Sequence, residues 1–186
     1  MIPIEYPETL HLQSAEGWLE LGSYAEANEE LDQIVPELRT HPDVLERRCH
    51  IYAATKQWLL CVDLAAAISV LAPDRAFGWL QRSYALHELK RTLEARDNLL
   101  PILENFPDNA ILRYNLACYE CQLGRLPHAH KWLTAAVELG GSQRMKLIAR
   151  DDEDLRATDM IGQMGLLARR DMANGRRREM LEEHKA

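Results

Sequence analysis

The sequence is poor in aromatic residues, which make up 6% of the chain and include only two phenylalanines. Sandwich and barrel folds take much of their core from aromatic and β-branched residues, so this shortage argues against both. Alanine, leucine and glutamate are abundant instead, and these are strong helix formers. The composition therefore predicts an all-α protein.

Long apolar runs are also missing. No segment approaches the roughly 18 to 20 consecutive apolar residues of a membrane-spanning helix. The start of the chain has no Lys or Arg before an apolar core, and Pro3, Glu5 and Pro7 interrupt it, so it does not resemble a secretory signal. We therefore expect a cytoplasmic protein without a membrane partner, whose four cysteines remain reduced thiols.

Motifs of catalysis and metal binding are absent from the sequence. It contains no Gly-rich phosphate loop, no His-Glu-x-x-His and no nucleophile elbow. Cys118 and Cys121 lie three residues apart on one predicted helix face, whereas His128 and His130 would point to opposite sides of theirs, which is the wrong spacing for zinc. The acidic run 151–154 is interpreted as solvated helix surface. We expect no catalytic residue, no metal and no cofactor.

Charge narrows the class of partner. The net charge is -7, and residues 1–142 carry the acidic excess. Such a surface repels phosphates, which argues against nonspecific binding of nucleic acid, and it allows basic or neutral peptides as partners.

A repeat with a period of 34 organises most of the chain. Four segments, beginning at Glu8, Pro42, Ala76 and Ala110, align without an insertion. Two aligned columns contain only small residues, and two contain only apolar ones. The small columns are Ala15, Cys49, Ser83, Ala117 and Ala27, Cys61, Ala95, Ala129; the apolar columns are Leu31, Ala65, Leu99, Leu133 and Ile34, Ile68, Ile102, Ala136. Spacings of three to four residues indicate helix faces.

Each repeat reads as two helices joined by a polar break, in which Gly22 and Gly124 supply left-handed residues and Lys56 and Lys90 take the same place. Repeats join at Pro42, Pro73 and Pro107, where the following aspartates help to cap or start the next helix. The expected helices are 8–21, 24–39, 43–55, 58–71, 76–89, 92–105, 110–123 and 126–139.

The pattern resembles the tetratricopeptide repeat family. Leu116, Ala117, Gly124, Ala129 and Ala136 stand at that motif's characteristic places in the fourth repeat. The resemblance implies an all-α, right-handed α-solenoid of antiparallel helix pairs with C-terminal capping helices. We expect an extension at 1–7, repeats at 8–41, 42–75, 76–109 and 110–142, and a cap and tail at 143–186.

Cys49 and Cys61 occupy the two small columns of the second repeat. We interpret both as packing residues, expect them to lie near each other, and expect thiols there and no disulfide.

In such a stack the first helices line a concave groove. The resemblance implies which columns face it, and an amphipathic set of side chains stands in these columns. The predicted groove residues are Arg47, His50, Phe77, Gln81, Tyr84, His87, Ile111, Tyr114, Asn115 and Cys118. Some of these aromatic residues could instead pack beneath their neighbours or under the C-terminal helices.

We expect a noncatalytic adaptor, assembly factor or chaperone that binds a peptide or helix of a partner protein in this groove, as a monomer or weak homodimer. Two alternatives remain open. One is a secretion-type chaperone, and the other is a self-associating scaffold that uses Trp58, Trp132 or the C-terminal helix.

Overall fold

The computed structural model describes residues 3–141 and 152–156. The chain divides into two compact units, Met1–Pro107 and Asp108–Ala186. Within the described ranges there are helices and turns and no β-strand, which confirms the all-α prediction for that part of the chain. None of the helices described there is both long enough and apolar enough to cross a bilayer.

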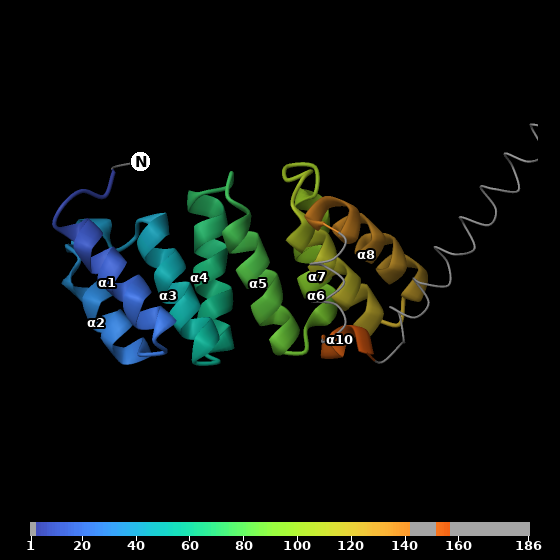
Figure 1. The fold of residues 1–186 in the computed structure, drawn as a ribbon, viewed down its shortest axis with the longest axis horizontal. Coiled ribbons are helices and arrows are strands. Elements are labelled where there is room, and N and C mark those ends of the chain that lie inside the picture. Colours follow the sequence, from blue (N-terminus) through green and yellow to red (C-terminus); the bar gives the residue numbers. More distant parts are fainter. Residues whose placement is uncertain (1–2, 142–151, 157–186) are drawn as a thin grey trace, which may run out of the picture. The chain divides into compact units, whose positions relative to one another are not determined.

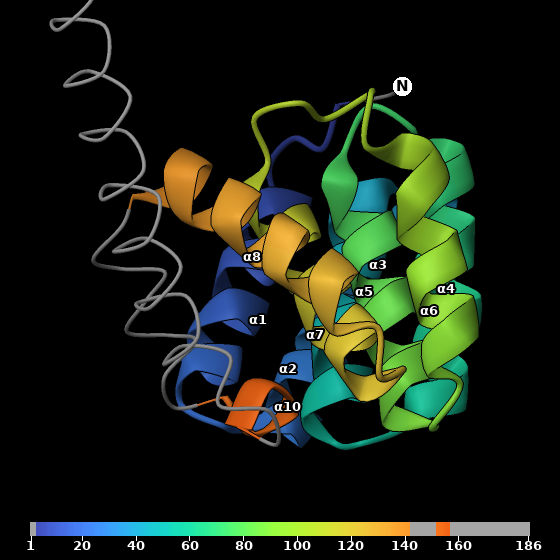
Figure 2. The ribbon, with the colours of Figure 1, turned by 90° about the vertical axis from the view of Figure 1, so that its right-hand side faces the viewer.

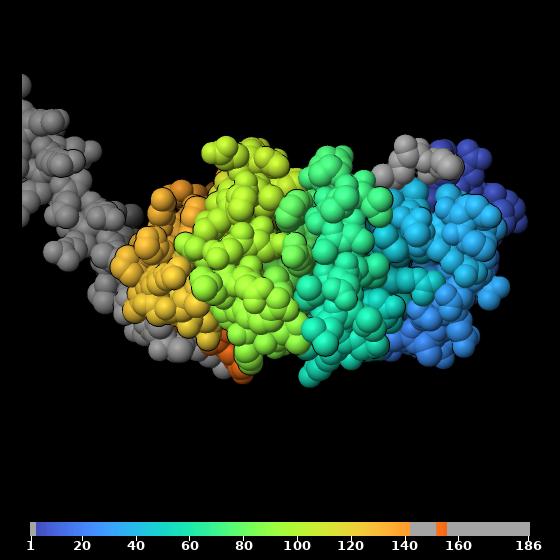
Figure 3. Space-filling model, turned by 180° about the vertical axis from the view of Figure 1, so that it is seen from behind, coloured from blue at the N-terminus to red at the C-terminus, as the bar shows by residue number. Residues whose placement is uncertain are grey.

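Three helical hairpins form the first unit (Figure 1). They pair α1 (Glu8–Glu20) with α2 (Tyr24–Gln33), α3 (Pro42–Ala54) with α4 (Trp58–Leu71), and α5 (Ala76–Glu88) with α6 (Thr92–Leu99). Short 3-10 turns follow α2 and α6, η1 (Pro36–Leu38) and η2 (Leu100–Ile102). From behind, the second helices of the hairpins are seen to share one face of this unit (Figure 3).

The second unit contains one hairpin, α7 (Ala110–Gln122) with α8 (Leu126–Gly140), and the short helix α10 (Glu153–Arg156). α10 lies against α7 (Figure 2). Apart from residues 152–156, the predicted cap and tail lie outside the described residues.

All eight repeat helices are present, but two of them end earlier than predicted. α2 stops at Gln33 and α6 at Leu99, where the pattern had indicated 39 and 105. Pro36 and Pro101 explain the difference, because proline cannot donate a backbone hydrogen bond to the preceding turn and disfavours helix at the residue before it. Each proline instead enters a 3-10 turn at its first or second position.

Helix starts also differ from the expectation in one detail. The side chains that cap α3 and α7 belong to His41, whose Nδ1 accepts from the Asp43 N–H at 3.2 Å, and to Asn109, whose Oδ1 accepts from Ile111 N–H at 3.0 Å. Asp43 therefore sits in the first turn, where its charge favours the positive end of the helix dipole.

The small columns lie where the two helices of each hairpin approach each other. All eight of these side chains are fully buried, from Ala15 with Ala27 in the first hairpin to Ala117 with Ala129 in the fourth. The residues of the apolar columns are buried as well. A larger side chain at the small positions would force the helix axes apart.

Cys49 and Cys61 are neighbours in the second hairpin, as predicted. Their Sγ atoms lie 3.4 Å apart, and both residues are free thiols. The hydrogen bond between them and burial raise the pKa of the Cys49 thiol, which keeps it protonated. The pair therefore acts as a packing contact within an apolar cluster.

Every hairpin turn has a residue in the left-handed conformation at the same position of the repeat. Gly22, Lys56, Lys90 and Gly124 have φ of 73°, 58°, 63° and 73°. In each turn this residue and the next one donate backbone hydrogen bonds to the last helical turn, for example Lys90 N–H to His87 O at 2.8 Å and Arg91 N–H to Leu86 O at 2.9 Å. This is the Schellman pattern, for which glycine is the unstrained choice.

Lys90→Gly is expected to stabilise the protein, because glycine adopts a positive φ without the steric penalty of a Cβ. The gain in free energy of unfolding should be roughly 0.5–1 kcal/mol, after subtraction of glycine's greater entropy in the unfolded chain. Urea denaturation would measure it, with Lys131→Gly inside α8 as a control that should destabilise. A Lys90 variant less stable than the wild type would contradict this account of the turn.

The second and third hairpins meet at Gly78. A Cβ built there would lie 2.6 Å from the Ser69 backbone nitrogen and 2.9 Å from the Ala65 carbonyl oxygen, closer than atoms can approach. α4 and α5 therefore touch backbone to backbone, and the hydrogen of Gly78 is what permits that contact.

Gly78→Ala should lower the free energy of unfolding by about 1–3 kcal/mol, because α5 would have to move away from α4. Gly17→Ala provides the matched control, since nothing lies within 4 Å of the added methyl group in α1. That change should stabilise by up to about 1 kcal/mol through helix propensity alone. Equal effects of the two substitutions in thermal or urea denaturation would exclude the close contact.

Candidate functional site

The first helices of the first unit border an open concavity of about 290 Å³. It lies between α1 and α3, with the start of α2 at one side. Residues of both polar and apolar character line it, among them Glu16, Leu19, Glu20, Tyr24, Arg47 and His50. Two of the predicted groove residues, Arg47 and His50, are thus on its wall. An open depression of this kind is suited to a side chain or turn of a partner.

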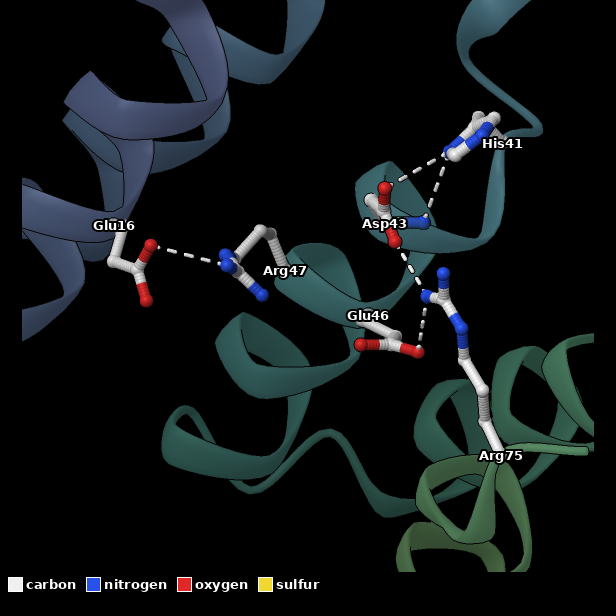
Figure 4. A network of polar contacts seen from close by, with 6 residues as sticks. All are labelled: Glu16, His41, Asp43, Glu46, Arg47 and Arg75. Atoms are coloured by element: carbon white, nitrogen blue, oxygen red, sulfur yellow. Dashed lines mark hydrogen bonds and ion pairs between the residues drawn. The ribbon is translucent and has the colours of Figure 1, made fainter. Parts of the chain in front are cut away.

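Charged side chains surround this surface (Figure 4). Arg47 Nη2 donates to Glu16 Oε2 at 3.0 Å and so joins α3 to α1. Arg75, just before α5, forms ion pairs with Asp43 and with Glu46, the latter at 3.2 Å. Both arginines are therefore matched by carboxylates.

His50 contacts the neighbouring hairpin through its ring. Its ring centroid lies 5.0 Å from that of Phe77 in α5, in a tilted arrangement. Although part of the side chain is exposed, partial burial lowers the pKa of His50 from its ordinary value, and the nearby Arg47 charge lowers it further. The ring is therefore neutral at physiological pH.

The lowered pKa of His50 makes the stability of the fold depend on pH. Because the folded-state pKa of His50 lies below the unfolded-state value near 6.5, the unfolded chain binds more protons between the two values. The contribution of neutral His50 to the free energy of unfolding is thus present at neutral pH and is lost as the pH falls through that window.

We expect His50→Gln to weaken the loss of stability on acidification. Denaturant midpoints measured from pH about 7.5 to 5.5 should fall less steeply for the variant than for the wild type. Titration of the His50 ring by NMR would check the direction independently. Parallel pH profiles for the two proteins would show that the His50 pKa is not lowered in the fold.

Three predicted residues of α5 have different surroundings. Tyr84 is 43% exposed and meets the Trp58 ring edge-on at 5.6 Å between centroids. Gln81 is partly buried, and its Oε1 atom has no hydrogen-bond partner among the described residues. His87 is only 7% exposed and its Nδ1 lies 3.0 Å from Thr92 Oγ1, which leaves little of it for a partner.

The predicted residues of α7 fall into two groups. Ile111 is exposed and Asn115 is partly buried, whereas Tyr114 and Cys118 are buried. Tyr114 Oη donates a hydrogen bond to Asp152 Oδ2 at 2.5 Å, and Cys118 Sγ lies 3.7 Å from the same oxygen. The segment that contains α10 thus covers this part of α7.

Asp152 was interpreted as solvated surface, and that interpretation is wrong. Its carboxylate accepts from α7 and also from the Asp154 N–H, at 2.9 Å. Nothing in the local pattern distinguishes it from its acidic neighbours, since its partners are 34 and 38 residues away. Sequence reasoning also missed Tyr24 at the concavity, because Tyr24 begins a second helix and only the first helices were expected to line the groove.

Cys118, Asp152 and Asp154 offer potential ligand atoms within 4.8 Å of one another. A metal would need the Cys118 thiolate. Burial, followed by the charges of the two aspartates, raises the pKa of Cys118 well above its ordinary value, so the thiol keeps its proton and donates to Asp152. We interpret the cluster as hydrogen-bonded, and the expectation of no metal stays a prediction.

Comparison with known proteins identifies the fold. No family model and no curated protein matches the sequence. Solved structures of MamA do match. The fragment from residue 41 onward of MamA from Desulfovibrio magneticus RS-1 is 17% identical and superposes with a TM-score of 0.66 over 90% of this chain and 98% of that one.

A structure of MamA from strain AMB-1 is 19% identical, with a TM-score of 0.60 over 87% of this chain and 91% of that one. At these identities the likeness shows the fold alone, which is of the tetratricopeptide-like helical kind. The resemblance predicted from the 34-residue repeat is therefore confirmed.

Proposed function

We propose that the first unit is a noncatalytic module that binds a peptide segment of another protein on the face formed by α1, α3 and α5. The observation that carries this proposal is the open concavity bordered by Arg47 and His50. Phe77 and Tyr84 stand two turns apart on one side of α5 and extend the apolar surface next to His50. Aromatic rings give a peptide large contact area at a small entropic cost.

Unpaired polar atoms support a backbone-binding role. Arg47 Nε and Gln81 Oε1 are buried without hydrogen-bond partners among the described residues. Such atoms carry a desolvation cost that a bound ligand can relieve. Both atoms are covered in the unbound protein, so a peptide reaches them only if these side chains turn outward; its backbone then offers a carbonyl oxygen to the Arg47 donor and an N–H to the Gln81 acceptor.

The charges favour a basic segment. Arg47 is matched by Glu16, and Arg75 is matched twice, by Asp43 and Glu46. Glu20, at the concavity, forms no ion pair with another described residue and adds further negative charge. A peptide with one Lys or Arg beside an apolar side chain is complementary to this surface. A contact of this size gives roughly micromolar affinity.

A second surface supports self-association as an alternative. α4 exposes apolar side chains near both of its ends, of which Val70 is 79% and Leu59 64% exposed. α4 lies on the face of the first unit seen in Figure 3. Large apolar side chains gathered on the surface in this way often mark a contact between proteins.

Affinity capture from native lysate would test which surface binds. The protein with Tyr84→Ala and His50→Ala should lose the captured partner, with an affinity at least about tenfold weaker once the partner is purified, because both rings leave the contact. Val70→Ala serves as the control on the α4 face and should capture the partner as the wild type does.

The opposite pattern, with capture lost only in the Val70 variant, would move the binding surface to α4. Retention of the partner by both variants would contradict the proposal. Light scattering of the same proteins separates self-association from binding of a different chain.

A further inference from the structure

A later segment of the same chain covers one face of α7. Tyr114, Cys118 and Gln122 are spaced four residues apart and therefore form one stripe along this helix, here named the α7 face. The short helix α10 lies against it (Figure 2). Leu155, in α10, is 1% exposed and is the apolar anchor of the contact.

Each residue of the α7 face contributes a hydrogen-bond donor. Tyr114 Oη and Cys118 Sγ both donate to Asp152 Oδ2, at 2.5 and 3.7 Å. Gln122 Nε2 donates to the Asp154 carbonyl oxygen at 2.9 Å. The α7 face therefore binds one carboxylate and one backbone carbonyl, with a leucine three residues after the carboxylate.

The donors remain protonated at neutral pH. Burial raises the pKa of Tyr114, and the neighbouring Cys118 and Asp152 raise it further. Burial likewise raises the pKa of Cys118. Both groups thus present a hydrogen to an incoming carboxylate, and no cation is needed to hold it.

The docked segment depends on α7 for its structure. A helix of four residues has no stability of its own, so the contacts with α7 must offset the entropy lost in ordering residues 152–156. Among these contacts are one buried leucine and hydrogen bonds from Tyr114, Cys118 and Gln122. Another segment with the same side chains can therefore replace it.

We propose that the α7 face is a docking site for an acidic segment of a partner protein with the pattern Asp-x-x-Leu in a helical turn, and that Asp152 and Leu155 compete with that partner from within the chain. The tether keeps the chain's own segment at an effective concentration on the order of millimolar. A partner segment binds only if its affinity and concentration are high enough to displace the tethered segment. The site is separate from the concavity of the first unit, so either proposal can fail without the other.

A peptide copy of the segment tests this proposal. The probe is a labelled peptide, ARDDEDLRATDM, which reproduces residues 149–160. Its binding to the full chain is followed by fluorescence anisotropy, with the wild type compared with a variant that carries Asp152→Ala and Leu155→Ala. The variant should bind the peptide at least about tenfold more tightly, because its own segment no longer competes.

Changes in the peptide check the contacts without altering the fold of the protein. Asp152→Asn or Leu155→Ala in the peptide should weaken binding to the opened variant about tenfold, through the loss of a charge-assisted hydrogen bond or of the apolar anchor. Glu153→Gln in the peptide is the matched control and should have no effect, because Glu153 is exposed in the docked segment. Tyr114→Phe in the opened variant should reduce binding similarly to Asp152→Asn.

Equal binding of the peptide by the wild type and the opened variant would overturn the proposal. So would undiminished binding of the Asp152→Asn peptide. A wild type that is dimeric in light scattering, and monomeric after Asp152→Ala and Leu155→Ala, would assign the face to a second copy instead. Circular dichroism verifies that the opened variant is folded; if it is not, Asp152→Asn alone, which retains Leu155, takes its place with the same expected direction.

Discussion

The fold depends on the close approach of two helices at positions where only small side chains fit. In the second hairpin this contact is made by Cys49 and Cys61, and their sulfur atoms lie 3.4 Å apart. Between the second and third hairpins the helices approach even more closely at Gly78, where a methyl group would collide with the backbone of α4. Close approach brings the larger apolar side chains on either side into contact, and their burial supplies most of the stability.

This constraint also creates the binding surface. A hairpin cannot bury both of its apolar sides alone, so it packs against the next hairpin and leaves the polar flanks of the first helices open. In the first unit these flanks carry paired charges, such as Arg47 with Glu16, and a pair of rings in tilted contact, His50 with Phe77. The surface is thus ordered by contacts between hairpins before any ligand arrives.

In the second unit the corresponding flank is not open. Tyr114 and Cys118 point their donors at Asp152, and Leu155 closes the contact. Burial of these donors would be costly if they stayed unpaired, and the aspartate removes that cost. A helix face that needs a carboxylate to be satisfied is already selective for ligands that carry one.

The 34-residue repeat alone dictated the helices, their turns and the buried columns, because these depend on contacts between residues close in sequence or one repeat apart. The columns from Ala15 to Ala129 are all buried, and Lys56 and Lys90 adopt the glycine conformation of their repeat position. The predicted ends of α2 and α6 were wrong, because Pro36 and Pro101 shorten both helices. The repeat period gave no sign of the backbone donors that these prolines lack.

Only the tertiary structure decided which groove residues are accessible. Cys118 and Tyr84 stand at the same position of their repeats, yet Cys118 is covered and Tyr84 is 43% exposed. The difference comes from Asp152, whose hydrogen-bond partner Tyr114 is 38 residues away. The repeat period does not predict contacts of this kind. They depend on where the chain packs after the last repeat and on which hydrogen-bond donors of α7 are unpaired at that place.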